Sequence, residues 1–275
     1  MGGPVKAPLG ATMTAMPDVW ASGDEYEPYV GRWSRLVAAE FLNWLAVPPG
    51  CRWLDFGCGT GALTAAILAS RDPAEVVGVD PSPGYVSWAA GHLAGARSRF
   101  VVGDATQLPG GRYDAVVSGL VLNFVPEATA SVRSMCSVVA DDGVVAAYVW
   151  DYAGRMDLIR YFWDAAIALN PAAAELDEGV RFPMCKPDRL EELWRDAGLD
   201  RVWSRPIDVP TVFRDFADYW EPFLGGQAPA PGYCMSLDEA RRADLREYLR
   251  RRLPVAADGS IRLIARAWAV KGQRN

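Results

Sequence analysis

Short apolar runs alternate with longer amphipathic segments between residues 52 and 150. The runs are rich in β-branched residues and too short for helices, which is typical of strands covered on both faces. They are Trp53 to Phe56, Val76 to Val79, Phe100 to Val102, Ala115 to Val117 and Val144 to Val149. Helices are expected between them at Gly61 to Ala69, Pro83 to Ala94 and Pro126 to Val139. This alternation predicts an α/β fold with a doubly wound parallel sheet.

The remainder of the chain is less regular. Strands are predicted at Arg201 to Val209 and Ser260 to Val270, after a helix at Lys186 to Ala197 that has a proline near its start and a glycine just past its end. Two inserted segments, residues 151–185 and 211–258, are rich in aromatic residues. We interpret these two segments as a helical cap.

Each inserted segment contains local structural signals. Residues 158–169 form an amphipathic aromatic stretch, a predicted helix that Asn170-Pro171 ends. Residues 225–232 are rich in glycine and proline and predict a flexible loop. Ser236 and Glu239 fit the spacing of a capping box, so a helix is expected to begin at Ser236.

The most informative motif lies between the first predicted strand and the first helix, where Asp55 is followed by glycines at 57, 59 and 61. Glycines allow a ligand to approach the backbone, and the first N–H groups of the following helix are free to meet it. Gly57, Gly59 and Ala62 also satisfy the dinucleotide fingerprint G-x-G-x-x-G/A. Asp55 favours a cationic amino group over a pyrophosphate, but a nicotinamide cofactor remains an alternative.

Two further carboxylates follow the next two predicted strands. Asp80 comes about 20 residues after the glycines, a spacing at which an acid accepts from ribose hydroxyls. Asp104 lies in Gly103-Asp104-Ala105 after the third strand. Each of these acids alone is an ordinary turn residue. Three acids at the carboxyl ends of successive strands indicate a ligand site, because open α/β sheets bind ligands at that edge.

The spacing Asp-x-Gly-x-Gly-x-Gly at residues 55–61 resembles the first motif of class I S-adenosylmethionine-dependent methyltransferases. The resemblance is to small-molecule enzymes of the UbiE-like and methyltransferase-11-like kind. It implies a seven-stranded sheet in which strands six and seven form an antiparallel pair. It also implies the cofactor contacts: the glycine loop under the methionine part, Asp55 at its amino end, Asp80 at the ribose, Asp104 with Ala105 at the adenine, and Ser118 among the contacts at the end of strand four.

The segment before the first strand adds two candidates. Small-molecule methyltransferases often carry an aromatic, arginine-bearing helix that closes over the cofactor, and residues 26–34 resemble it. The resemblance implies that Arg32 pairs with the methionine carboxylate and that Tyr29 or Trp33 faces the sulfonium, because aromatic faces attract cations. For Trp33, packing in the core is an equally good interpretation.

The acceptor side is less well defined. Methyl transfer is an in-line displacement that requires alignment and exclusion of water but no base. Asp151 and Tyr152, after the fifth strand, are weak catalytic candidates, together with Tyr148 and Tyr26; a helix cap is the simpler role for Asp151. The Asn-Pro-Pro-Tyr box of the methyltransferases that act on planar amines in DNA or glutamine is missing after strand four, which counts against an amide or nucleobase substrate. The aromatic cap predicts a hydrophobic or aromatic acceptor, or only a core for the cap itself.

Composition narrows the range of partners. A formal net charge of −6 and a pI near 5.0 disfavour nucleic acid. Five scattered cysteines fit a reducing, cytoplasmic compartment, and the single histidine, His92, excludes a histidine-rich metal site or a Ser-His-Asp triad. The apolar runs are shorter than the ~18 residues of a membrane span, so no membrane partner is expected. A small molecule is the expected partner, with the chain a monomer or homodimer.

The chain is therefore expected to be an S-adenosylmethionine-dependent methyltransferase that acts on an O, N or C atom of a small molecule. Alternatives are a nicotinamide-dependent oxidoreductase, for which no Tyr-x-x-x-Lys pair is found, and a cofactor-binding protein without turnover. The expected divisions are a disordered leader (1–17, with Met13 or Met16 as other possible starts), N-terminal helices over the cofactor (18–47), a cofactor-binding core (48–150), a cap insertion (151–185) and the remaining core (186–275) with its insertion (211–258).

Overall fold

A computed structural model describes residues 27–226 and 228–274. The predicted leader, Tyr26 and the first part of the predicted N-terminal helices lie outside these residues. The described chain begins with a short π-helix, η1 (Glu27–Gly31), which runs directly into α2 (Arg32–Leu45).

The centre of the molecule is a seven-stranded sheet in the order β3-β2-β1-β4-β5-β7-β6. Its strands are β1 (Arg52–Phe56), β2 (Glu75–Asp80), β3 (Ser98–Val102), β4 (Tyr113–Gly119), β5 (Val139–Trp150), β6 (Asp200–Phe213) and β7 (Ile261–Gln273). The first five strands are parallel, whereas β7 is antiparallel to both β5 and β6. The fold expected from the sequence, including the antiparallel final pair, is confirmed.

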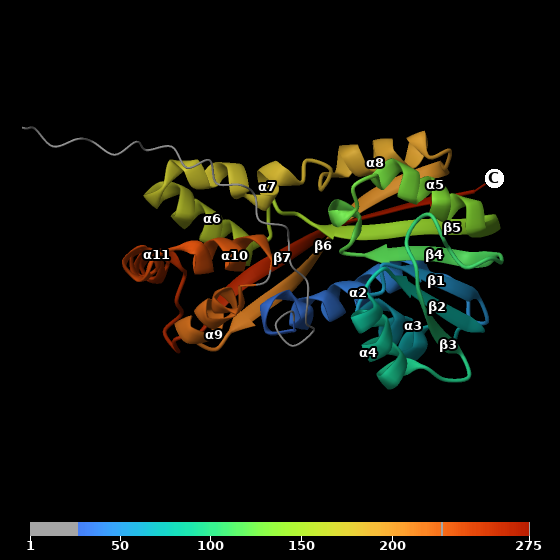
Figure 1. Cartoon of the computed structure of the whole chain (residues 1–275), viewed down its shortest axis with the longest axis horizontal. Coiled ribbons are helices and arrows are strands. Elements are labelled where there is room, and N and C mark those ends of the chain that lie inside the picture. The colour runs from blue at the N-terminus through green and yellow to red at the C-terminus, as the bar shows by residue number, and fades with distance from the viewer. Residues whose placement is uncertain (1–26, 227, 275) are drawn as a thin grey trace, which may run out of the picture.

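Helices cover both faces of the sheet. On one face lie α2, α3 (Ala62–Ser70) and α4 (Pro83–Leu93), and on the other lie α5 (Ala128–Val138) and α8 (Pro187–Asp196) (Figure 1). The bounds of α3, α4, α5 and α8 agree with the predicted helices to within two residues at each end. β1, β2 and β4 are almost entirely buried between the two layers, as expected for apolar strands covered on both faces.

The last two strands extend past the rest of the sheet. β7 pairs with β5 only from Gln273 back to Ala267, but it continues to pair with β6 as far as Ile261 opposite Phe213. β6 is therefore longer than the predicted Arg201 to Val209, because the alternation of buried residues continues through Thr211 and Phe213. Pro210 does not interrupt the strand, since β6 is at the sheet edge.

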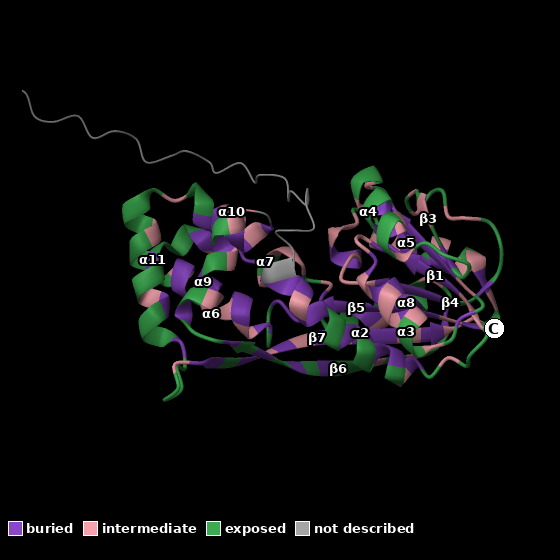
Figure 2. Ribbon diagram, turned by 90° about the horizontal axis from the view of Figure 1, so that it is seen from below, coloured by how far each residue is buried: buried purple, intermediate pink, exposed green. Residues whose placement is uncertain are grey.

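This extended ribbon supports a helical cap at the carboxyl edge of the sheet (Figures 1 and 2). The cap contains α6 (Asp157–Leu169), η3 (Pro171–Leu176), α7 (Glu178–Arg181), α9 (Phe216–Trp220), η4 (Glu221–Gly225), α10 (Pro229–Ser236) and α11 (Glu239–Arg252). Its aromatic residues pack on one another: Phe162 of α6 stacks on Phe223 at 4.5 Å between ring centroids. The aromatic residues thus provide the core that the cap needs.

Two local predictions in the cap were wrong. Part of the glycine- and proline-rich segment is helical, because α10 begins at Pro229 and proline suits the first turn of a helix. The predicted capping box is not formed: Asp238 caps α11, accepting from the Arg241 N–H at 2.8 Å. Ser236 instead ends α10, and its hydroxyl donates to the Tyr233 carbonyl. None of the helices in the described part of the chain is both long and apolar enough to cross a membrane.

Candidate functional site

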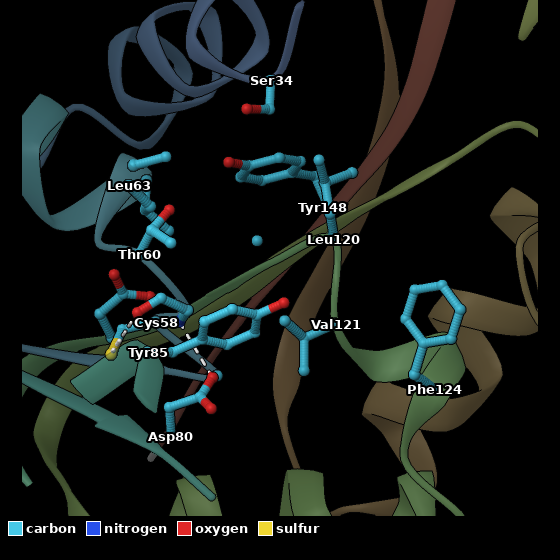
Figure 3. Close-up of a pocket in the computed structure, with 15 residues that line it drawn as sticks. Ser34, Cys58, Thr60, Leu63, Asp80, Tyr85, Leu120, Val121, Phe124 and Tyr148 are labelled. Atoms are coloured by element: carbon cyan, nitrogen blue, oxygen red, sulfur yellow. Dashed lines mark hydrogen bonds between the residues drawn. The ribbon is translucent and has the colours of Figure 1, made fainter. Parts of the chain in front are cut away.

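A cavity of about 200 Å³ lies at the carboxyl ends of β1, β2 and β4, under α2. We call it the edge cavity. The loop between β1 and α3 forms one wall, the residues after β4 form another, and Tyr85 of α4 and Tyr148 of β5 direct their rings into the space between (Figure 3). Most of the exposed lining is apolar, and Asp55 and Asp80 are the carboxylates on it. The cavity therefore combines two acids with a largely apolar surface, as ligand sites commonly do.

The three predicted glycines adopt left-handed backbone conformations, with φ of +72° at Gly57, +52° at Gly59 and +87° at Gly61. A Cβ atom on Gly57 would lie 2.5 Å from a methyl carbon of Val121. At Gly59 a Cβ atom would meet nothing within 4 Å, and this residue lines the cavity. The close approach at Gly57 shapes the loop, whereas the bare backbone at Gly59 leaves room for a ligand.

Asp55 is 1% exposed at the end of β1 and lines the edge cavity. The Thr64 hydroxyl of α3 donates to its Oδ2 at 2.7 Å. Burial raises the pKa of Asp55 to about 7, and the nearby charge of Asp80 adds to this effect. A cationic amino group placed beside Asp55 would favour the ionised carboxylate, which is the chemistry predicted for this residue.

We expect the affinity for S-adenosylmethionine to depend on the ionisation of Asp55. A carboxyl with a pKa of about 7 is mostly neutral at pH 6 and mostly ionised at pH 8, so affinity is expected to be about tenfold weaker at pH 6. Calorimetric titrations across this range measure the dependence, and Asp55→Asn is expected to abolish it. An equal pH dependence in wild type and Asp55→Asn would contradict this role.

Asp80 ends β2 and is 7% exposed on the cavity wall. The Gly59 N–H donates to its Oδ2 at 2.9 Å (Figure 3), and the Ser82 N–H donates to its Oδ1 at 2.9 Å. Burial raises its pKa above the ordinary range, partly offset by these two bonds. The same carboxylate therefore holds the glycine loop in place and faces the cavity, where it has oxygen lone pairs for further donors.

The third predicted acid lies outside the edge cavity. The Gly103 N–H donates to the Asp80 carbonyl at 3.1 Å, which places Asp104 beside the end of β2. Asp104 is exposed, and the Thr106 N–H and hydroxyl hold the pKa of its carboxyl below the usual range. Ala105 packs partly against the core. The sheet thus aligns Asp55, Asp80 and Asp104 on one edge, with Asp104 outermost.

Several other predicted contacts are placed elsewhere. The Arg32 guanidinium pairs with Asp218 of α9 at 3.0 Å and lies over the rings of Trp33 and Phe213, so it does not line the edge cavity. Trp33 is buried against Phe213, as the core-packing interpretation proposed. Ser118 is fully buried in β4, and its hydroxyl has no partner among the described residues and does not line the cavity.

The ion pair between Arg32 and Asp218 gives a test of both assignments. Arg32→Met and Asp218→Asn are each expected to lower the free energy of unfolding, and a double-mutant cycle is expected to give a coupling of about 1 kcal/mol. Neither variant is expected to change the affinity for S-adenosylmethionine more than about threefold, since an ion pair between α2 and the cap accounts for Arg32. A large loss of affinity in Arg32→Met alone would instead assign Arg32 to the cofactor carboxylate.

A second, smaller cavity of about 20 Å³ adjoins the first, and Leu120 and Phe124 line both. We call it the inner cavity. Tyr29 and Tyr152 line it, and so does Glu178 of α7, a buried acid that the sequence analysis missed. Asp151 lines neither cavity: its Oδ2 accepts from the Arg155 N–H at 3.0 Å, so it caps a turn after β5.

Tyr85 was also missed, whereas Tyr148 had been considered only as a proton acceptor. Tyr85 lies one turn into α4, whose N-terminal Ser82 accepts from the Tyr85 N–H. Tyr85 follows β2, the strand that ends in Asp80, by five residues. This position in the sequence is the signal that could have placed Tyr85 at the cavity. Nothing local in the sequence marks Glu178, because its burial depends on how the cap folds.

Comparisons with known proteins agree with this geometry. A family model described as a methyltransferase domain matches residues 54–143. The demethylmenaquinone methyltransferase of Roseiflexus castenholzii is 32% identical over 181 residues, which cover 60% of this chain and 75% of that protein. The trans-aconitate 2-methyltransferase of Methylobacterium radiotolerans is 30% identical, with 67% of this chain and 77% of that protein covered.

A solved structure has the same fold. Phosphoethanolamine N-methyltransferase 2 of Haemonchus contortus, in complex with S-adenosylhomocysteine, has a TM-score of 0.56 at 13% identity, covering 91% of this chain and 58% of that one. Each of the two relatives matches a larger share of the chain than the family model does. With that extent of similarity, the chain belongs to the class I S-adenosylmethionine-dependent methyltransferases, and its cofactor is S-adenosylmethionine.

Proposed function

We propose that the chain transfers the methyl group of S-adenosylmethionine to an O, N or C atom of a small, largely apolar or aromatic molecule. The observation that carries the proposal is the arrangement of the two cavities. An edge cavity with carboxylates adjoins an inner cavity lined by aromatic residues and covered by the cap. A polar cofactor and an apolar acceptor would each find a matching surface there.

The described residues fit this cofactor. We assign Asp55, with the loop of Gly57, Gly59 and Gly61, to the methionine end, Asp80 to the ribose, and Asp104 with Ala105 to the adenine. The open space in front of Gly59 and the raised pKa of Asp55 support the first assignment, since a cation would lower that pKa again. Asp104 lies after β3, farther from β1 than Asp80 is. This position supports a cofactor whose ribose lies at Asp80 and whose adenine lies beyond it, at Asp104.

When bound, the cofactor supplies a methyl group activated by a positive sulfonium. The protein has to align the acceptor with that group at about 3 to 3.5 Å and to exclude water. Leu120 and Phe124, which line both cavities, provide apolar surface between the two binding regions. We propose Tyr148 and Tyr152 as residues near the acceptor, one in each cavity, and no catalytic role for Asp151.

We also propose the organisation that the sequence suggested, a cofactor-binding core from residue 48 to 150 with caps from both inserted segments. The second insertion then begins after Phe213, where β6 ends.

Nucleic acid is not a proposed partner, because the net charge of −6 does not attract phosphate backbones.

The proposed function is tested with methyl-labelled S-adenosylmethionine and a panel of aromatic phenols, amines, carboxylic acids and activated carbon acids. We expect label in at least one product and none with Asp80→Ala at the same cofactor concentration. Tight binding of S-adenosylmethionine with no labelled product across the panel would favour the remaining alternative, a protein that binds the cofactor without methyl transfer. Tight binding of NAD in place of S-adenosylmethionine would contradict the cofactor site itself.

A further inference from the structure

The inner cavity contains a buried acid that the proposed methyl transfer does not use. Glu178 is 1% exposed at the start of α7, and the indole N–H of Trp163 donates to its carboxylate. Tyr29, from η1 near the N-terminus, lines the same cavity at 3% exposed. Its hydroxyl is buried and has no hydrogen-bond partner among the described residues. The Glu178 carboxyl and the Tyr29 hydroxyl, from distant parts of the chain, therefore line the same small cavity.

A separate ion pair holds Glu178 in place. Arg160 of α6 donates to both oxygens of Asp177, at 2.8 and 2.7 Å, and to the Tyr152 carbonyl at 2.9 Å. Asp177 in turn caps α7 by accepting from the Gly179 N–H at 2.8 Å. This pair fixes the first turn of α7, so the orientation of Glu178 follows from it. Because Arg160 is engaged by Asp177, its charge does not neutralise Glu178.

Glu178 forms no ion pair within the described chain. Burial raises the pKa of Glu178 to about 8; the negative charge of Asp177 adds to this effect, whereas Arg181 and the Trp163 N–H oppose it. Tyr29 and Tyr152 line the same space, and burial and the charge of Glu178 raise the pKa of Tyr29. A buried acid without a counterion is costly, and it is stabilised when a cation reaches it.

The remaining lining has the character of a cation site. The aromatic side chains of Tyr29, Phe124, Trp150 and Tyr152 line the inner cavity, and no lysine or arginine of residues 27–226 and 228–274 does. Aromatic faces and a carboxylate together attract a positive charge and repel a negative one. The volume of about 20 Å³ suits a group the size of one water molecule, which matches an ammonium head and not a whole molecule.

We propose that the inner cavity binds the protonated amino group of the methyl acceptor, with the Glu178 carboxylate and the Tyr29 hydroxyl as hydrogen-bond acceptors and the surrounding rings as cation–π partners. This inference rests on the proposed function, because it identifies the acceptor as an alkylamine that carries an aromatic group. The rest of the acceptor then extends past Leu120 and Phe124 into the edge cavity, toward the cofactor. An acceptor with a carboxylate in that position would meet aromatic faces and no cation of the described lining, so we expect it to bind weakly.

The test compares ligands that share a skeleton and differ in one head group. Three sets are titrated calorimetrically into the full-length protein saturated with S-adenosylhomocysteine: phenethylamine, 2-phenylethanol and 3-phenylpropanoate; benzylamine, benzyl alcohol and phenylacetate; tryptamine, tryptophol and indole-3-propanoate. In at least one set the amine is expected to bind about tenfold more tightly than the alcohol, since a hydrogen bond between charged groups is the stronger kind. The carboxylate is expected to bind most weakly.

Proton release on amine binding shows whether Glu178 is the group that binds the amine. At pH 7 a carboxyl with a pKa of about 8 is mostly protonated, so amine binding is expected to release close to one proton, measured in buffers of different ionisation enthalpy. Glu178→Gln keeps a group able to accept from Trp163, and it is expected to abolish this release and to weaken amine binding about tenfold. Tyr29→Phe is expected to weaken binding less. Glu175→Gln, on exposed Glu175 of η3, is the matched control and is expected to behave as wild type.

Each outcome decides the proposal. It is overturned if no amine binds, if alcohols or carboxylates bind as tightly as amines in every set, or if Glu178→Gln binds amines and releases protons as wild type does. The labelled-methyl assay separates this failure from failure of the proposed function. Methyl transfer only to acceptors that carry no amino group overturns the amine site and keeps the methyltransferase. Amine binding through Glu178 with no methyl transfer to any acceptor overturns the proposed function instead.

Discussion

Replacing Asp80 with Ala is expected to weaken the binding of S-adenosylmethionine roughly 100-fold, because the proposed ribose contact consists of two hydrogen bonds to a charged group. The loss of two hydrogen bonds from backbone N–H groups to Asp80 is expected to weaken binding further. The Gly59 and Ser82 N–H groups both donate to this carboxylate, so its removal also loosens the glycine loop. Calorimetric titration with S-adenosylmethionine and S-adenosylhomocysteine measures the change for both ligands.

The matched control is Asp72→Ala. The Asp72 side chain is 80% exposed and pairs with Arg97 at the surface, so its removal takes away one acid without touching the edge cavity. Affinity is expected to be unchanged in this control. Thermal unfolding shows whether Asp80→Ala remains folded at the titration temperature. If the folded Asp80→Ala protein binds within about threefold of wild type, the ribose assignment is wrong.

Replacing Gly59 with Ala is expected to weaken cofactor binding by at least about tenfold, because the new methyl group enters the space that a cofactor would occupy. Gly50→Ala provides a close control. Both glycines have positive φ, +52° at Gly59 and +77° at Gly50, and at neither would a Cβ atom meet anything within 4 Å. Both substitutions are therefore expected to lower the free energy of unfolding by about 1 to 2 kcal/mol, because alanine disfavours the left-handed conformation. Of the two glycines, only Gly59 lines the edge cavity.

Stability and affinity together distinguish the possible results. Similar melting temperatures for the two variants, with affinity lost only in Gly59→Ala, would support the assignment of the loop to the cofactor. Equal affinity in the two variants would contradict it. Gly57→Ala is expected to lose stability as well, because its Cβ atom would lie 2.5 Å from Val121.

The parts of the site that were predictable are those set by local sequence. Asp55, the three glycines and Asp80 lie within a strand, a turn and the next strand, so their spacing alone brings them to one edge of a parallel sheet. Their neighbours in the edge cavity come from α2, α4, β4 with the residues after it, and β5. The relative positions of those elements follow from packing of the whole domain, and no spacing rule gives them.

Arg32 shows why the cap was harder to predict. Its partner, Asp218, is 186 positions away, and the sequence offers no signal that links the two. Glu178 is similar, because its burial depends on Tyr29, Trp163 and the folding of α7 against α6. The Ser236 capping box was wrong for a local reason: Asp238, two residues later, is an equally good cap and is the residue that caps α11.

The account is tested most directly by a crystal structure of the protein with S-adenosylhomocysteine bound. It predicts the ligand in the edge cavity, with its amino group within hydrogen-bond distance of Asp55, both ribose hydroxyls on Asp80, and the adenine amine near Asp104. The Glu178 carboxylate and the Tyr29 hydroxyl are predicted to stay clear of the ligand. A ligand bound elsewhere, or bound in the edge cavity without contacts to Asp55 and Asp80, would contradict the account.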